Sequence, residues 1–276
     1  MNRSHVLIYS LLSTLLLVAT QARADDVATT ASLQAIADGE HRSAAHRARN
    51  RYRHPAETLA FFGIRDDMTV VEISPGGGGW YTEILAPFLR ANGTLYAGNY
   101  DPDAEEKYYQ RNSRVFSEKM AASPDLYDKV RITVFDPPKK LEPAPAGSAD
   151  MVVTFRNFHN WMEDGDHEAA LQGMHQVLKP GGILGVVQHR GNPGAEQDPQ
   201  AESGYVRQDY LIRLVELAGF KLVASSEINA NPKDTKDHPE GVWTLPPNFQ
   251  LEDVDRDNYT AIGESDRMTL KFVKTE

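Results

Sequence analysis

The chain has 276 residues, 41% of them apolar and none of them cysteine, so it can bury a substantial core but forms neither disulfides nor thiolate metal sites. Its 39 acidic and 29 basic side chains give a formal charge of −10. That charge argues against nucleic acid as a partner, because binding a polyanion requires a positive surface. The spacing of the histidines and acids predicts no metal site.

Residues 1–24 have the composition of a cleavable secretory signal peptide. Arg3 supplies a basic start, an apolar run follows from Val6 to Ala19, and Ala22-Arg23-Ala24 has the small-x-small pattern of a cleavage site. The apolar run is shorter than the roughly 20 residues that span a bilayer. We therefore expect cleavage after Ala24 and a periplasmic or secreted protein without a stable membrane span. A retained anchor is the alternative.

Residues 25–66 are expected to form an N-terminal helical extension, in which Pro55 opens a short helix. From residue 67 onward, short apolar strands alternate with amphipathic helices, which are expected over residues 80–89, 103–121, 166–178 and 205–218. This alternation predicts a doubly wound α/β domain over residues 67–276, in which ligands bind beyond the carboxyl ends of the strands. The expected strands are Thr69–Ile73, Thr94–Gly98, Val130–Phe135, Ala149–Phe155, Ile183–Gln188, Phe220–Ile228 and Asp266–Lys274.

Four consecutive glycines, residues 76–79, join the first strand of this domain to its first helix. Without β-carbons the backbone can approach a ligand closely, and the helix that follows presents free amides. A dinucleotide fingerprint starting at Gly76 would require a third glycine where the chain has Tyr81, and no Gly-Lys-Ser/Thr tripeptide follows to make a phosphate-binding P-loop. We expect a nucleotide-like ligand on this turn; a tight turn without a ligand is the alternative.

The stretch Glu72-Ile73-Ser74-Pro75-Gly76-Gly77-Gly78 resembles the first motif of the class I S-adenosylmethionine-dependent methyltransferases, with Ser74 in place of the usual first glycine. The segments LKPGGILGVV, LVELAGFKLV and DRMTLKFVK resemble later parts of the same family, in the same order. HPAETLAFFGI, SPGGGGWYTEILAP and WTLPP, together with the signal peptide, resemble a group of exported bacterial methyltransferases of unknown substrate. The resemblance covers the chain from about Pro55 to its C-terminus. It implies a Rossmann-like, mostly parallel seven-stranded sheet whose last strand is antiparallel.

The resemblance also implies S-adenosylmethionine as the cofactor, with Glu72 and the backbone of residues 74–78 along its methionine and ribose part. Asn99 stands where the family usually has an acid that binds the ribose hydroxyls, and its amide lacks the charge of a carboxylate. Asp101, two residues later, is a possible substitute. Two more residues are expected at the cofactor. Asp136, after the third strand, would lie near the adenine amine, although it could instead be a turn acid. Asn157 follows the fourth strand.

In this fold the acceptor pocket lies beyond the fourth and fifth strands, which here end in FRNFHNWMEDGDH and QHRGNP. Methyl transfer from a sulfonium requires alignment of acceptor and methyl, and a general base if the acceptor is protonated. His159 is the first candidate for that base and His189 the second; a packed, hydrogen-bonded loop histidine is the alternative. The residues expected around the acceptor are Arg156, Asn160, Trp161 and Arg190, although the arginines could instead pair with acids.

Two further segments are expected near the ligands. Val242–Phe249 could form a lid, and the arginines between Arg42 and Arg53 could cover the cofactor or be solvated. The sequence therefore predicts an exported methyltransferase of a small-molecule or cell-envelope acceptor. The alternative is a non-catalytic periplasmic binding protein that kept the fold. Ser74 and Asn99 favour that alternative, whereas Glu72 and the complete glycine turn favour the enzyme.

Overall fold

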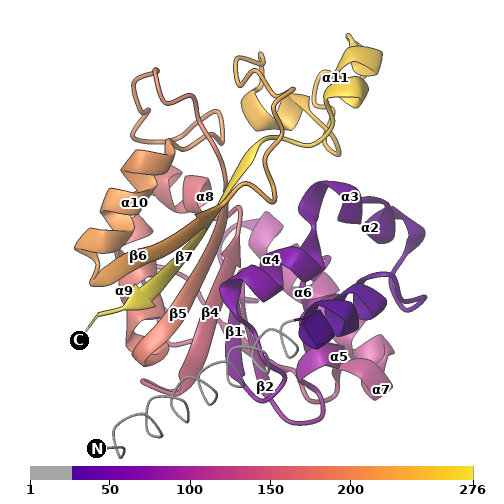
Figure 1. Cartoon of the computed structure of the whole chain (residues 1–276), viewed down its shortest axis with the longest axis vertical. Helices are drawn as coiled ribbons and strands as arrows, with labels where there is room; N and C mark the ends of the chain where they lie inside the picture. Colours follow the sequence, from indigo (N-terminus) through magenta and orange to yellow (C-terminus); the bar gives the residue numbers. More distant parts are fainter. Residues whose placement is uncertain (1–26, 276) are drawn as a thin grey trace, which may run out of the picture.

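The computed structural model describes residues 27–275, so the predicted signal peptide lies outside the described residues. The described chain folds into a twisted seven-stranded sheet with helices on both faces (Figure 1). The strand order is β3-β2-β1-β4-β5-β7-β6, in which β1 to β5 pair in parallel and β7 is antiparallel to both of its neighbours. The strands are β1 (Thr69–Ile73), β2 (Thr94–Asn99), β3 (Arg131–Val134), β4 (Ala149–Phe155), β5 (Leu178–His189), β6 (Phe220–Ser226) and β7 (Arg267–Lys274). The predicted α/β fold with an antiparallel last strand is confirmed.

Helices cover both faces of the sheet (Figure 1). Their apolar side chains pack against it in two buried clusters. One cluster includes Phe62, Leu85 and Phe116, and the other includes Phe158 and Leu171, all of them at most 1% exposed. The helices of the first face are α4 (Pro55–Phe62), α5 (Thr82–Leu89), α6 (Lys107–Ala122) and α7 (Pro124–Tyr127), and those of the second are α8 (Phe158–Glu163), α9 (His167–Val177) and α10 (Gln208–Leu217). Burial of both apolar faces is what stabilises this layered arrangement.

The N-terminal extension is helical as predicted, but it is broken into short pieces: residues 27–37, α2 (Ala44–Ala48), α3 (Asn50–Arg53) and α4. Leu33 is fully buried in the same apolar cluster as α5, so the extension shares the core of the sheet. Arg42 donates from Nε to Oε2 of Glu83 on α5, over 3.0 Å. Arg42 also donates from Nη1 to Oδ1 of Asn50, over 2.9 Å, and so connects the start of α3 to α5.

Two local features differ from the sequence expectations. The segment after β4, for which no helix was expected, forms α8, whose Phe158 and Trp161 pack into the core. The Lys179–Gly182 segment was expected to be a turn into the fifth strand, but β5 already begins at Leu178. Its pairing with β4 shifts between Ala149 and Met151, which makes the segment a bulge. Periodicity could not detect either feature, because a one-turn helix and a bulge are too short for a repeating pattern.

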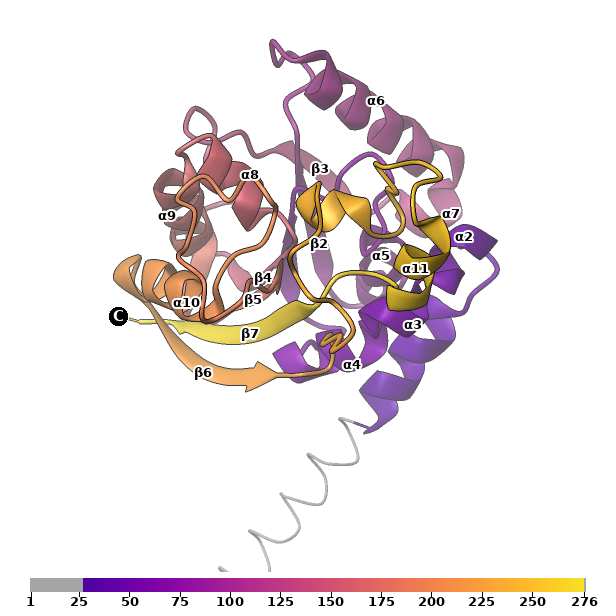
Figure 2. The same ribbon diagram turned by 90° about the horizontal axis from the view of Figure 1, so that it is seen from above.

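The antiparallel β7 begins at the edge where β1, β4 and β5 end, so the residues before it reach the same place. The segment between β6 and β7, which contains η1 (Gly241–Thr244) and α11 (Arg256–Ile262), lies over this edge (Figure 2). Glu264, two residues after α11, is bound by Arg53 of α3. Three separate parts of the chain therefore meet above the strand ends. Within residues 27–275, no helix combines the length and apolar character needed to cross a membrane.

Candidate active site

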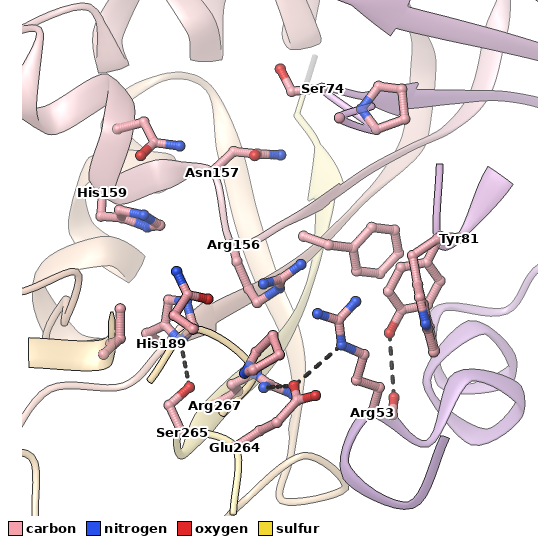
Figure 3. Close-up of a pocket in the computed structure, with 18 of the residues that line it drawn as sticks. Arg53, Ser74, Tyr81, Arg156, Asn157, His159, His189, Glu264, Ser265 and Arg267 are labelled. Atoms are coloured by element: carbon pink, nitrogen blue, oxygen red, sulfur yellow. Dashed lines mark hydrogen bonds and ion pairs between the residues drawn. The ribbon is translucent and has the colours of Figure 1, made fainter. Parts of the chain in front are cut away.

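A cavity of about 270 Å³ lies at the carboxyl ends of β1, β4 and β5, and its wall is completed by α3 and by the segment before β7 (Figure 3). A second cavity, of about 390 Å³, lies beside it and reaches the ends of β2 and β3. Four residues line both cavities: Ser74, Tyr100, Asn157 and Asn160. The two hollows are thus neighbouring compartments of one site, at the position where an α/β sheet binds its ligands.

The glycine turn faces the first cavity at only one of its glycines. Ser74 and Gly76 have positive φ angles of 50° and 69°, and a β-carbon at Gly76 would meet no atom within 4 Å. A β-carbon at Gly77 would lie 2.7 Å from Oδ1 of Asn112 on α6, whereas one at Gly78 would lie 3.7 Å from His46. Gly76 therefore leaves open space for a ligand, and Gly77 allows α6 to pack against the turn, whereas Gly78 would accept a β-carbon at an ordinary contact distance.

Glu72, at the end of β1, lines the first cavity and is 2% exposed. Its Oε2 accepts a hydrogen bond of 2.6 Å from Oγ1 of Thr82 at the start of α5. Burial raises the pKa of Glu72 to about 7, although the bond from Thr82 opposes this shift. This carboxyl can therefore gain or lose a proton near neutral pH.

Of the polar residues at the ends of β2 and β3, only some reach a cavity. Asn99 is 1% exposed and lines neither cavity, and its side-chain nitrogen and oxygen have no hydrogen-bond partner among the described residues. Asp101 is bound by Lys140 and by the backbone N–H of Asp103. Asp136 lines the second cavity, where burial and then the charge of Asp101 raise its pKa. Of the predicted nucleoside-binding acids, Asp136 alone faces this cavity.

Tyr100, which the sequence interpretation did not single out, lines both cavities directly after Asn99. Its ring lies 4.9 Å from that of Tyr109, measured between centroids, and burial raises its pKa. The sequence signal for Tyr100 is an aromatic residue directly after a strand whose end is expected at the ligand.

The residues after β4 divide between the two cavities. Asn157 donates from Nδ2 to the carbonyl of Ile73, over 3.1 Å, and to Oγ1 of Thr154, over 3.0 Å, so it ties the end of β4 to the end of β1. Asn160 lines both cavities. Trp161 lines only the second, where its ring packs edge-on against Phe158. Asn157 thus fixes the shape of the wall that separates the two compartments.

His159 lies on the first turn of α8 and is 6% exposed. Gln188 Nε2 lies 3.1 Å from both the carbonyl oxygen of Gly204 and Nδ1 of His159. The carbonyl can only accept, which fixes the orientation of the amide, and the same NH₂ group then donates to Nδ1. The proton of neutral His159 is therefore on Nε2. Burial, followed by the charge of Arg156, lowers the pKa of His159 to about 4.

This arrangement changes the role available to His159. Its one basic nitrogen already accepts a bond from Gln188, so the ring offers an N–H donor to a ligand. His189 contacts Oγ of Ser265 through Nδ1, over 2.5 Å, and burial and the charge of His159 lower its pKa well below the ordinary value. The edge of Trp243 lies over His159, with ring centroids 5.7 Å apart. Both imidazoles are neutral at physiological pH.

Arginines form the opposite wall of the first cavity. The carboxylate of Glu264, which is 2% exposed, is bound by Arg53 of α3 and by Arg267 of β7 (Figure 3). Arg49, directly before α3, binds it as well. The guanidinium of Arg53 also lies 4.7 Å from the ring centroid of Trp80. The run of arginines between Arg42 and Arg53 indicated in the sequence that this segment could lie at the site. No sequence pattern near Glu264 or Arg267 indicated that these two residues would contact Arg53 and its neighbours.

The two predicted acceptor arginines behave differently. Arg156 lines the cavity with a φ of 65°, and its guanidinium has no hydrogen bond or ion pair with any described residue. Arg190 lies outside both cavities and is bound by the carboxylates of Glu227 and Asp266, at 2.7 and 2.9 Å. The structure therefore brings Arg156 to the site and engages Arg190 in a separate ion-pair network.

Sequence and fold comparisons agree with this geometry. The signature of a family described as "Methyltransferase domain" matches residues 44–225, which is more than half of the chain. The chain belongs to this family. The methyltransferase matches no curated protein.

Its fold is similar to that of a SAM-dependent methyltransferase from Aquifex aeolicus, with 15% identity, a TM-score of 0.57 and coverage of 83% of this chain and 93% of the other. The fold is also similar to that of the [4+2]-cyclase SpnF, with 16% identity, a TM-score of 0.55 and coverage of 81% of this chain and 80% of the other. For a putative sarcosine dimethylglycine methyltransferase from Galdieria sulphuraria, the identity is 16%, the TM-score is 0.52, and the match covers 83% of this chain and 85% of the other.

The cofactor of the methyltransferase is S-adenosylmethionine, as its family and fold imply. The residues present fit this molecule. Gly76 leaves open space beside the cavity, and two compartments adjoin at the strand ends. The acid usually expected after β2 is replaced by Asn99. Tyr100, directly after it, and Asp136, after β3, are among the polar residues that line the nucleoside compartment.

Proposed function

We propose that the methyltransferase transfers a methyl group by in-line displacement to a small-molecule or cell-envelope acceptor bound in the first cavity. The observation that carries this proposal is the continuity of the two compartments through Ser74, Tyr100, Asn157 and Asn160. The first cavity has about 270 Å³ and also holds the methionine part of the cofactor at Glu72 and Gly76. The space that remains suits a small acceptor group rather than a folded macromolecule.

In this proposal Tyr100 and Asp136 hold the nucleoside, while Gly76 and Glu72 lie beside the methionine part. S-adenosylmethionine supplies an electrophilic methyl group on a sulfonium. The Nε2–H of His159 donates a hydrogen bond that orients the acceptor.

The lid suggested by the sequence is also part of the proposal. Trp243, Pro246 and Pro247 line the first cavity from the segment between β6 and β7, where they exclude water from the acceptor. Orientation and exclusion of water are the main protein contributions that such a displacement requires.

Binding and turnover test this function separately. Purified residues 25–276 are titrated with S-adenosylmethionine and S-adenosylhomocysteine in a calorimeter, and saturable binding of both is expected. The protein is then incubated with cofactor carrying a ¹³C-methyl group and small-molecule or envelope extracts, and labelled products are sought by mass spectrometry. Absence of binding would contradict the proposed methyl transfer. Binding without any labelled product supports the non-catalytic binding protein.

We propose, in addition, that the protein is exported and acts outside the cytoplasm. Support comes from the basic start, the apolar run and the cleavage pattern of residues 1–24. Alkaline phosphatase fused after Ala24 is expected to be active, because that enzyme requires an oxidising compartment. Replacing the apolar Leu15 and Leu16 with arginine should abolish the activity. An inactive wild-type fusion that accumulates in the cytoplasm contradicts export.

A further inference from the structure

We propose that the acceptor carries an oxyanion, a carboxylate or a phosphate, which binds the guanidinium of Arg156 with Arg53 and Arg267 beside it. This inference rests on the proposed methyl transfer, because it names the chemical class of the molecule that enters the first cavity. Arg156 comes from the end of β4, Arg53 from α3 and Arg267 from β7, and Figure 3 shows the three side chains gathered in the centre of the site.

The charges that line the first cavity do not balance. Its wall has four arginines but only two carboxylates, Glu72 and Glu264. Glu264 is shared by Arg49, Arg53 and Arg267, whereas Glu72 is bound to Thr82. The cavity thus has an excess of at least two positive charges, and Arg156 has no acidic partner among the described residues.

Several donors of these arginines are unused. Nη2 of Arg53 and Nε of Arg267 are buried and have no hydrogen-bond partner within residues 27–275. Both side chains are 2% exposed. A buried charged donor without a hydrogen bond is unfavourable, so an incoming oxyanion that pairs with it gains free energy. Planar guanidinium groups match the two oxygens of a carboxylate or phosphate.

The arginines also repel one another. Burial and the charge of Arg267 lower the pKa of Arg156 to about 10, and burial and the charge of Arg156 lower that of Arg53. The backbone of Arg156 adopts a left-handed φ of 65°, a strained conformation for a residue other than glycine. Mutual repulsion and backbone strain at one unpaired side chain are typical of a binding site.

The excess charge of the arginines is not neutralised by the cofactor. Its methionine part has one carboxylate, but its ammonium and sulfonium groups leave the whole molecule with a net positive charge. In this inference the negative charge that balances the cavity comes from the acceptor. The rival source of the oxyanion is the cofactor's own carboxylate, and the experiment below separates the two.

Arg156→Asn removes the charge, and asparagine tolerates the left-handed backbone better than most residues do. Arg156→Lys keeps the charge but loses the paired donors. Arg65→Gln is the matched control, because Arg65 is an exposed arginine paired with Asp67 and lies before β1, at the opposite end of that strand. Thermal denaturation establishes that each variant is folded.

The first measurement is the affinity for S-adenosylhomocysteine and for 5′-methylthioadenosine, which lacks the amino-acid tail. If the acceptor is the source of the oxyanion, Arg156→Asn changes both affinities by less than about threefold. A loss of about tenfold or more for S-adenosylhomocysteine alone would assign Arg156 to the cofactor tail and overturn the inference.

The second measurement uses two pairs of probes on protein saturated with S-adenosylhomocysteine: benzoate against benzamide, and phenyl phosphate against benzyl alcohol. Saturation-transfer NMR should detect at least one anion but neither neutral partner. The anion's affinity should fall about tenfold in Arg156→Asn, less in Arg156→Lys and not in Arg65→Gln. Equal binding of neutral and anionic probes, or anion binding unchanged in Arg156→Asn, overturns the inference. If the wild type fails to bind S-adenosylhomocysteine, the proposed function fails, and the probes still test the anion site on the unloaded protein.

Discussion

Gln188 donates a hydrogen bond from Nε2 to Nδ1 of His159, over 3.1 Å, and thereby fixes the proton of the neutral imidazole on Nε2. The carbonyl of Gly204, also at 3.1 Å, prevents the amide from turning over, because two carbonyl oxygens would then face each other. The sequence placed His159 at the site as a candidate base. The structure leaves it there as a neutral donor.

Gln188→Leu should remove this control of the tautomer. In wild-type protein labelled with ¹⁵N-histidine, we expect the nitrogen shifts of His159 at pH 7 to show Nε2 protonated and Nδ1 unprotonated, with a titration midpoint at about 4. In the variant we expect both tautomers, together with a loss of about 1–3 kcal/mol of stability from the unpaired Gly204 carbonyl. A wild-type spectrum with the proton on Nδ1 would restore His159 as a base.

Gly76 and Gly78 should respond differently to the same substitution. Gly76→Ala adds a β-carbon that points into the first cavity at a φ of 69°, so we expect cofactor affinity to fall by about tenfold or more, with a loss of roughly 1 kcal/mol of stability. Gly78→Ala places its β-carbon 3.7 Å from His46, an ordinary contact, and should leave affinity within about twofold of wild type. Calorimetric titration with S-adenosylhomocysteine measures both. Equal losses would mean that the turn acts through packing alone.

Glu72 should make the folded protein less stable as the pH rises. Its pKa is about 7 in the folded state against an ordinary 4.5, so the folded state holds the proton more tightly than the unfolded chain does. The resulting stabilisation is complete below pH 4.5 and is lost as the pH rises through 7; the difference is on the order of 3 kcal/mol.

Urea denaturation between pH 5 and pH 8 tests this effect. Glu72→Gln can still accept the bond from Thr82 but does not titrate, so its stability relative to wild type should increase over this range. Glu118→Gln is the control, because Glu118 is exposed on α6 and pairs only with Arg114 among the described residues. Parallel pH profiles for wild type and Glu72→Gln would mean that Glu72 titrates normally.

The strands of the sheet could be predicted from sequence because each is an apolar run bounded by turn residues. β1 and β4 have the predicted bounds, and the sequence also brought Arg156, Asn157 and His159 to the carboxyl end of β4. These predictions succeeded because the carboxyl ends of parallel strands meet at one edge of the sheet. Recognising a strand in the sequence therefore also locates the residues that follow it.

The remaining parts of the site depend on contacts that are distant in sequence. Arg49 and Glu264 are 215 residues apart in the sequence, yet Nε of Arg49 lies 2.5 Å from Oε1 of Glu264. No local sequence pattern encodes that pairing. The same holds for Arg190, whose position after β5 suggested the acceptor, although Glu227 and Asp266 hold it elsewhere. The proton position on His159 depends on Gly204, and so it too required the structure.

Glu264→Gln should both destabilise the protein and increase its response to anions. The charges of Arg267 and Arg53 and the bond from Arg49 outweigh burial and lower the pKa of Glu264, so its carboxylate is the counterion of these arginines. Removing that charge leaves buried arginines uncompensated, which typically costs about 3–5 kcal/mol.

An added oxyanion can supply part of the missing charge. We therefore expect sodium sulfate to raise the melting temperature of Glu264→Gln more than that of wild type, and more than sodium chloride does at equal ionic strength. Comparison with wild type removes the general stabilisation by sulfate that all proteins show. The added Arg156→Asn substitution should reduce the extra sulfate response, because one donor of the cluster is gone. An identical sulfate response in wild type and Glu264→Gln would mean that the arginines do not form an accessible oxyanion site.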